Sequence, residues 1–112
     1  MAGKFVLKHS HNGEFMFNLH AGNGQAILTS QMYKTHESAI NGIESVKKNS
    51  AIAAHFEKHT AKDGSPYFVL KAANGLEIGR SEMYSSSSAM ENGIESVMHN
   101  APGAALEDAT KK

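Results

Sequence analysis

The chain contains an internal duplication. When residues 5–50 are aligned with residues 56–101, a shift of 51 positions, 18 of the 46 pairs are identical. The longest identical block is NGIESV, at residues 41–46 and 92–97. Because two copies are too few for a stacked solenoid, the repeat predicts a pseudo-twofold fold built from two similar halves.

Each copy begins with three short stretches in which apolar and polar residues alternate. The stretches of the first copy are 5–9, 15–20 and 26–29, and those of the second centre on Phe56, on Phe68 with Leu70, and on Ile78. Asn-Gly or Asp-Gly dipeptides separate them, and these are strong hairpin signals. The pattern predicts a three-stranded antiparallel meander in each half.

The hydrophobic period then changes to three or four residues, which predicts one amphipathic helix in each half. The apolar positions are Ala39, Ile43 and Val46 in the first copy and Met90, Ile94 and Val97 in the second. Thr35 and the run of serines at 85–88 offer side-chain oxygens that can cap the helix starts. Asn49 and Asn100 are predicted to be the left-handed residues that end the helices.

Each copy is therefore predicted to be a βββα unit. Three strands and one helix cannot bury a sheet face alone, so we expect one continuous, mainly antiparallel sheet with both helices on one face, an α+β fold. We expect residues 1–112 to form a single domain, with repeat 1 at 5–50 and repeat 2 at 56–101. Residues 104–112 show no periodicity, which predicts a flexible tail.

Gly42 and Gly93 lie inside the predicted helices, next to the apolar stripe. A glycine within a helix costs about 1 kcal/mol relative to alanine. Close approach of the helix to the sheet, or of the two helices to each other, would offset this cost. We therefore expect both glycines to be buried in helical conformation.

The composition excludes some classes of function and disfavours others. Eleven basic and eleven acidic residues balance, whereas nucleic-acid binders normally carry a basic excess. The absence of cysteine excludes disulfides and thiolate chemistry and fits a reducing compartment. We find neither the apolar core of a signal peptide nor a stretch long enough to cross a membrane, and so expect a cytoplasmic protein.

Seven histidines raise the question of a metal site. Such a site needs three or four converging ligands. No histidine aligns with another across the repeat, and five of the seven align with lysine, which indicates solvated positions. We therefore expect neither a metal nor a cofactor, and His9 with His11, at strand spacing, is the remaining candidate pair.

Three pairs of polar residues shared by the copies are the candidates for catalysis. They are Ser30/Ser81, Tyr33/Tyr84 and Glu44/Glu95. A serine nucleophile needs a base beside it, and no histidine accompanies these residues in either copy. The sequence therefore favours structural roles for them and predicts no catalytic residue, with an enzyme built on this shared set as the alternative.

Four stretches carry a resemblance to a known family: GNGQAILTSQMY at 22–33, NGIESVKKN at 41–49, YFVLKAANGLEIGRSEMY at 67–84 and NGIESVMHN at 92–100. The chain resembles the YegP-like family of small bacterial proteins of unknown function, in its duplicated form. The resemblance implies tandem βββα units in one sheet, with a terminal strand that can be exchanged between the halves. It implies no catalytic residue and no cofactor.

A sheet with both helices on one side leaves its other face open. The residues predicted to lie there are Val6, Lys8, Met16, Asn18 and His20 in the first half and Tyr67, Val69 and Lys71 in the second. We expect a non-catalytic interaction module that binds a protein or small ligand on this face or self-associates through a sheet edge. Nucleic-acid binding on the open face is a weaker alternative.

Overall fold

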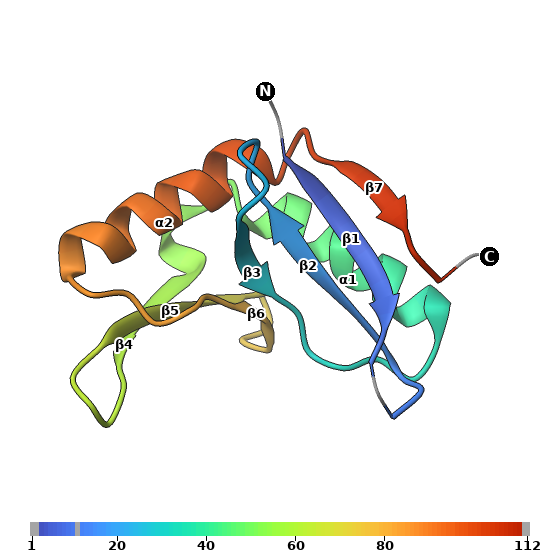
Figure 1. Ribbon diagram of the computed structural model, residues 1–112, viewed down its shortest axis with the longest axis horizontal. Coiled ribbons are helices and arrows are strands. Elements are labelled where there is room, and N and C mark those ends of the chain that lie inside the picture. Colours follow the sequence, from blue (N-terminus) through green and yellow to red (C-terminus); the bar gives the residue numbers. More distant parts are fainter. Residues whose placement is uncertain (1–2, 11, 111–112) are drawn as a thin grey trace.

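The structure, a computed structural model, describes residues 3–10 and 12–110 (Figure 1). The elements, in chain order, are β1 (Lys4–His9), β2 (Phe15–His20), β3 (Ala26–Thr29), α1 (His36–Asn49), a short 3-10 helix (Ala53–His55), β4 (Phe56–Thr60), β5 (Pro66–Lys71), β6 (Glu77–Arg80), α2 (Ser87–Asn100) and β7 (Ala105–Asp108). Thr35 and Ser86 cap α1 and α2, and each side chain accepts a hydrogen bond from a backbone N–H three residues later.

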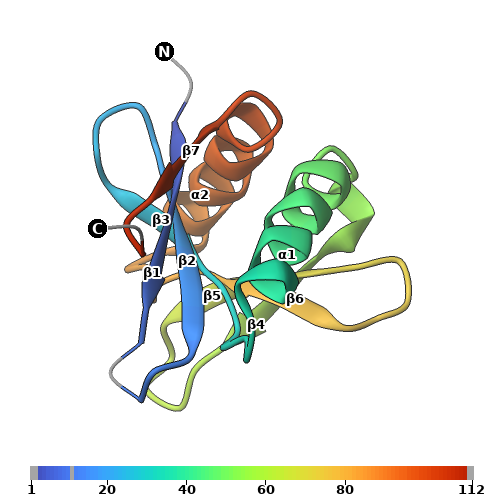
Figure 2. The same ribbon diagram turned by 90° about the vertical axis from the view of Figure 1, so that its right-hand side faces the viewer.

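The strands form a single sheet in the order β4-β5-β6-β3-β2-β1-β7. All neighbouring strands are antiparallel except β1 and β7, which run parallel. Both helices lie on one side of this strongly twisted sheet (Figure 2). The predicted α+β fold, with two helices on one mainly antiparallel sheet, is confirmed.

The helices hold the two halves together. At the centre of the sheet, β3 and β6 share one register pair within the described residues, Thr29 with Arg80. Helix α1 packs on β2 of its own half and also on β5 and β6, while α2 packs on β5 and on β3. Each helix therefore covers strands of both halves. The core between helices and sheet contains the repeated pairs Phe5/Phe56, Phe17/Phe68, Leu19/Leu70, Ile43/Ile94 and Val46/Val97.

The helix glycines make room for a tyrosine. Gly42 and Gly93 are buried within α1 and α2, as predicted. A Cβ atom on Gly42 would lie 2.7 Å from Cζ of Tyr33, and one on Gly93 would lie 2.7 Å from Cζ of Tyr84. In each half, the tyrosine ring therefore packs directly against the glycine of the NGIESV block.

The predicted left-handed conformation of Asn49 and Asn100 is wrong. Both residues are the last of their helices, and no non-glycine residue in the described part of the chain has a positive φ. Each side-chain amide donates back to the carbonyl four residues earlier, that of Ser45 or Ser96, at 2.8 Å. The chain stays right-handed at Ser50 and Ala101, whose N–H groups donate to the carbonyls of Val46 and Val97 at 2.8 and 2.9 Å, so these terminal carbonyls need no left-handed residue.

The prediction of a flexible tail is wrong for residues 105–108, which form β7. This strand pairs with β1, so the chain that leaves α2 joins the sheet of the first half. Three of its four residues are exposed. The strand therefore carries no hydrophobic alternation, and its pairing depends on backbone hydrogen bonds such as Ala109 N–H to the Leu7 carbonyl (2.7 Å). The repeat bounds 5–50 and 56–101 stay a prediction.

Acid is expected to destabilise the protein between about pH 4 and pH 2. Hydrogen bonds from Thr110, and then from His36, hold the pKa of Asp108 at about 2, below its ordinary value of 3.8. A pKa lowered by folding stabilises the protein above the ordinary value, and this stabilisation is lost as the pH falls through the folded pKa. Urea unfolding at pH 5, 4, 3 and 2 should therefore show a smaller decline for Asp108→Asn than for the parent protein. Equal declines would contradict this role of Asp108.

None of the helices in the described part of the chain is long and apolar enough to cross a membrane.

Candidate functional site

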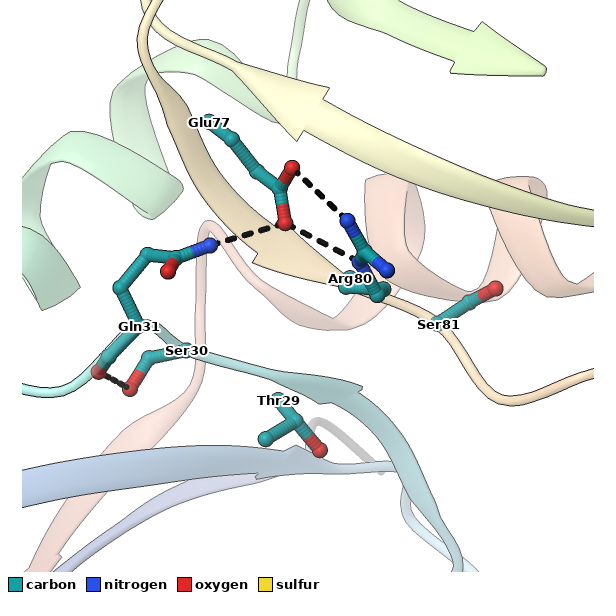
Figure 3. Close-up of a pocket in the computed structure, with 6 residues that line it drawn as sticks. All are labelled: Thr29, Ser30, Gln31, Glu77, Arg80 and Ser81. Carbon is teal, nitrogen blue, oxygen red and sulfur yellow. Dashed lines mark hydrogen bonds and ion pairs between the residues drawn. The ribbon is translucent and has the colours of Figure 1, made fainter. Parts of the chain in front are cut away.

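A shallow pocket of about 380 Å³ lies where the two halves meet (Figure 3). It is formed where β3 and β6 end, beside the pair that joins the halves. Its lining residues are Thr29, Ser30, Gln31, Glu77, Arg80 and Ser81. The pocket therefore draws on both repeats and exists only because they share one sheet.

Arg80 is held in a fixed orientation at this pocket. Its Nε lies 3.1 Å from one carboxylate oxygen of Glu77, and its Nη2 lies 3.2 Å from the other. Figure 3 shows Glu77 between Arg80 and Gln31, whose Nε2 donates to the same carboxylate at 2.8 Å. The hydrogen bonds that Arg80 donates to Glu77 raise the pKa of Arg80. Because Nη1 takes no part in these bonds, it can still donate to a ligand.

Arg80 belongs to a row of side chains that crosses three strands of the second half. Its guanidinium lies 5.4 Å from the ring centroid of Tyr67 on β5, and the Tyr67 ring stacks on His59 of β4 at 5.3 Å. We call His59, Tyr67 and Arg80 the open-face row. Their counterparts in the first half are Lys8, Met16 and Thr29, so the row exists in one half only.

The open face differs from the prediction at two positions. Asn18 and Val69 are 8% and 2% exposed, although they lie outside the core between helices and sheet. Asn18 donates to Oγ1 of Thr29 at 2.8 Å, and Val69 stands opposite Arg80 in the sheet register. Neighbouring long or polar side chains on the same face therefore cover both residues.

Sequence reasoning missed Arg80, Glu77 and His59. It concentrated on residues shared by the repeats, whereas these positions differ between them. One signal was available: Arg80 is the only arginine in the chain and aligns with Thr29.

Carboxylates neutralise cations of the sheet. Nζ of Lys71 lies 3.0 Å from Oε1 of Glu57. Hydrogen bonds from Lys71, and to a smaller extent from His59, lower the pKa of Glu57. Arg80 is paired with Glu77 in the same way. These two cations are therefore already paired with carboxylates, whereas binding of a phosphate backbone depends on cations that neutralise phosphates.

The structure assigns packing duties to the shared serines. Oγ of Ser30 accepts from Phe17 N–H at 2.9 Å and donates to the Gln31 carbonyl at 2.7 Å. Oγ of Ser81 makes the equivalent bonds to Phe68 and Glu82. These hydroxyls tie the chain after β3 and β6 to the neighbouring strand, although both residues also line the pocket.

The other shared residues do not join the serines. The ring of Tyr33 stacks on Phe17, and Tyr84 stacks on Phe68; burial raises the pKa of both tyrosines. Glu44 and Glu95 are exposed on the helices. Within the described residues no hydrogen bond links a serine, a tyrosine and a glutamate of this set. The structure therefore does not assemble a nucleophile with a base from it.

In the part of the chain that the structure describes, no group of three or more His, Cys, Asp or Glu side chains could hold a metal ion. The His9 ring lies 4.7 Å from the ring of Phe15. His11, the other member of the candidate pair, lies outside the described residues.

Comparison with family models decides where the chain belongs. The model described as "Domain of unknown function (DUF1508)" matches residues 10–57 and again residues 61–108. The chain belongs to the DUF1508 family. The two matches are offset by the 51 residues of the internal repeat, and each extends past its helix into the strand that follows.

Bacterial relatives of the DUF1508 chain match it over almost its whole length. It is 56% identical over 111 residues to a UPF0339 protein of Bordetella pertussis, with 99% of both chains covered. It is 50% identical over 108 residues to a UPF0339 protein of Pseudomonas aeruginosa, with 96% and 98% covered. These relatives, together with the solved structure of yegP from E. coli described next, confirm the resemblance to the YegP-like family.

Two solution NMR structures share the fold. The protein of unknown function yegP from E. coli is 46% identical and matches with a TM-score of 0.94, covering 100% of this chain and 97% of its own. A UPF0339 protein from Shewanella oneidensis is 51% identical and matches with a TM-score of 0.92, covering 98% and 93%.

Proposed function

We propose that this DUF1508 protein is a non-catalytic binding module whose ligand docks on the open face, at the pocket between β3 and β6. The observation that carries the proposal is the arrangement of Arg80. Glu77 and Tyr67 hold its guanidinium in place before any ligand arrives. Binding to a side chain that is already ordered costs less conformational entropy than binding to a free one.

The difference between the repeats supports this proposal. Core positions such as Phe17/Phe68 are identical, because both halves pack in the same way. The residues of the open-face row, in contrast, differ from the residues aligned with them in the first half, which are Lys8, Met16 and Thr29. These positions lie on the face away from the helices, so packing against the helices does not determine which residues stand there. Ligand binding would explain the row, whereas solvent exposure alone would not.

The pocket suits a ligand with both hydrogen-bond donors and acceptors. Arg80 offers donors, Gln31 an amide and Glu77 a carboxylate. A protein segment or a small polar molecule meets this description. We further propose that the protein acts in the cytoplasm, in line with a chain that contains no cysteine.

A pull-down with matched variants tests the proposal. The immobilised protein, its Arg80→Gln variant and its Lys8→Gln variant would be incubated with native bacterial lysate. Retained proteins and small molecules would then be identified by mass spectrometry. A hydrogen bond to a charged group contributes about 1.5–3 kcal/mol, so Arg80→Gln should reduce retention of the ligand about tenfold or more.

Lys8→Gln is the control, because it removes one positive charge from the open face of the first half. It should retain the ligand at the parent level. Circular dichroism would first establish that both variants are folded. If every retained component binds the parent protein and Arg80→Gln equally, the ligand does not dock at this pocket.

A further inference from the structure

The parallel pairing of β7 with β1 suggests a second binding surface, separate from the pocket. Leu106, Glu107 and Asp108 lie opposite Phe5, Val6 and Leu7. Backbone bonds mark both ends of the pairing, from Ala105 N–H to the Gly3 carbonyl at 3.4 Å and from Ala109 N–H to the Leu7 carbonyl at 2.7 Å. The edge of β1 thus accepts a short extended segment in a defined register.

Strand β7 buries little apolar surface. Ala105, Leu106 and Glu107 are exposed, and Leu106 retains 45% of its surface. The ion pair of Glu107 with Lys4 is about half exposed on both sides, and such pairs contribute about 0–1 kcal/mol. Segments with little buried apolar surface open locally at low free energy, so β7 can leave without unfolding the rest of the protein.

Strand β1 stays in place when β7 leaves. Phe5 and Leu7 are fully buried in the core, and β1 pairs along its whole length with β2. Departure of β7 would therefore uncover an ordered strand edge, which is the arrangement that β-strand addition requires.

The chemistry of this edge selects an acidic segment. Nζ of Lys4 lies 2.7 Å from Glu107 Oε1, and Nε2 of His36 lies 2.7 Å from Asp108 Oδ2. Lys4 and His36 thus contact two consecutive acidic residues of β7. The residue before them, Leu106, lies opposite Phe5. The edge therefore recognises an apolar residue followed by two acidic ones.

The other edge of the sheet provides an internal comparison. Strand β4 has no outer neighbour in the described part of the chain. The residues that align with Lys4 and His36 are His55 and Ser87, and Lys58 of β4 is already paired with Glu91 of α2. Among the residues that the structure describes, the slot for an acidic segment therefore exists at β1 and not at β4.

We propose that the edge of β1 is a docking site for an extended segment of a partner protein with the pattern apolar-acidic-acidic. The segment adds parallel to β1, and β7 occupies the site in cis until the partner displaces it. The partner must compete with a tethered strand whose effective concentration is on the order of millimolar. Because of this competition, the apparent affinity of the parent protein for the partner segment is lower than the affinity of the vacant β1 edge.

Binding of a labelled peptide tests the proposal. The probe is a fluorescent peptide with the sequence AALEDAT, that of residues 104–110, followed by anisotropy. The double variant Glu107→Lys/Asp108→Lys should release β7, because it places positive charges against Lys4 and His36. This variant should bind the peptide saturably, and the parent protein should bind at least tenfold more weakly.

Two controls establish the site of binding. A peptide with the sequence AALKKAT should not bind the double variant, and adding Lys4→Glu to that variant should abolish binding of AALEDAT. Absence of saturable binding to a folded double variant overturns the proposal, and so does equal binding of the two peptides.

Hydrogen exchange in the parent protein tests the proposal without any substitution. The amides of β7 should exchange through local opening, well before those of β5, and millimolar unlabelled AALEDAT should accelerate their exchange. If the amides of β7 exchange only when the whole protein unfolds, or if the peptide has no effect, the proposal is wrong.

Discussion

Substitution of Gly42 by leucine is expected to destabilise the protein by about 1–3 kcal/mol, the usual cost of overpacking a core. A Cβ atom at this position would lie 2.7 Å from Cζ of Tyr33 and 3.1 Å from Cε2 of Phe17. Phe17 is fully buried, so its ring has little room to move. The sign of the effect is informative, because leucine would otherwise stabilise a helix interior by roughly 1 kcal/mol relative to glycine.

Urea unfolding monitored by circular dichroism measures this effect. Asn41→Leu is the matched control, since Asn41 precedes Gly42 in α1 and is exposed; its stability should change by about 0.5 kcal/mol or less. Gly93→Leu should reproduce the loss in the second half, where Tyr84 takes the place of Tyr33. A Gly42→Leu protein as stable as the parent would show that the tyrosine ring does not depend on the glycine.

Exchange of Leu28 and Gly79 is expected to restore stability that each single change removes. The two positions correspond in the repeats, and they meet across the junction of the halves: a Cβ on Gly79 would lie 2.6 Å from Cδ2 of Leu28. Leu28 is 2% exposed. Leu28→Gly should therefore cost at least the roughly 2–5 kcal/mol of a buried leucine truncated to alanine. Gly79→Leu should cost about 1–3 kcal/mol through overpacking.

The double variant Leu28→Gly/Gly79→Leu keeps one leucine and one glycine at the junction. Thermal and urea unfolding of the four proteins gives a double-mutant cycle, in which contacting residues couple by about 0.5–3 kcal/mol. The double variant should be less destabilised than the sum of the single variants. Additive losses would show that the two residues do not share one space.

The local elements could be read from the sequence because each has a short-range pattern. The alternating stretches became β1 to β6, and the three-to-four-residue period with its Thr35 and serine caps became α1 and α2. The burial of Gly42 and Gly93 was also predictable, because both repeats keep a costly glycine at the same place. The residue that fills the space, Tyr33 or Tyr84, was not predictable, since it lies nine positions before the glycine in a separate segment.

Three features had no local signal. Strand β7 pairs through its backbone with a segment about 100 residues earlier, and its exposed side chains show no period. Apart from the shared Ser30 and Ser81, the residues that line the Arg80 pocket differ between the repeats, so comparison of identical positions passed over them. Asn49 gave a misleading signal, because an asparagine at a helix end can either adopt a left-handed conformation or bond back to its own helix.

The sequence by itself determined the duplication, the βββα order of each half, the buried helix stripe and the family, because these depend on repetition and local periodicity. Only the tertiary structure decided that Leu28 meets Gly79, that Arg80 is clamped at the junction and that β7 covers the edge of β1. The physical reason is that these contacts join unlike residues from opposite halves. Their geometry follows from the twist of the shared sheet and the crossing of the helices.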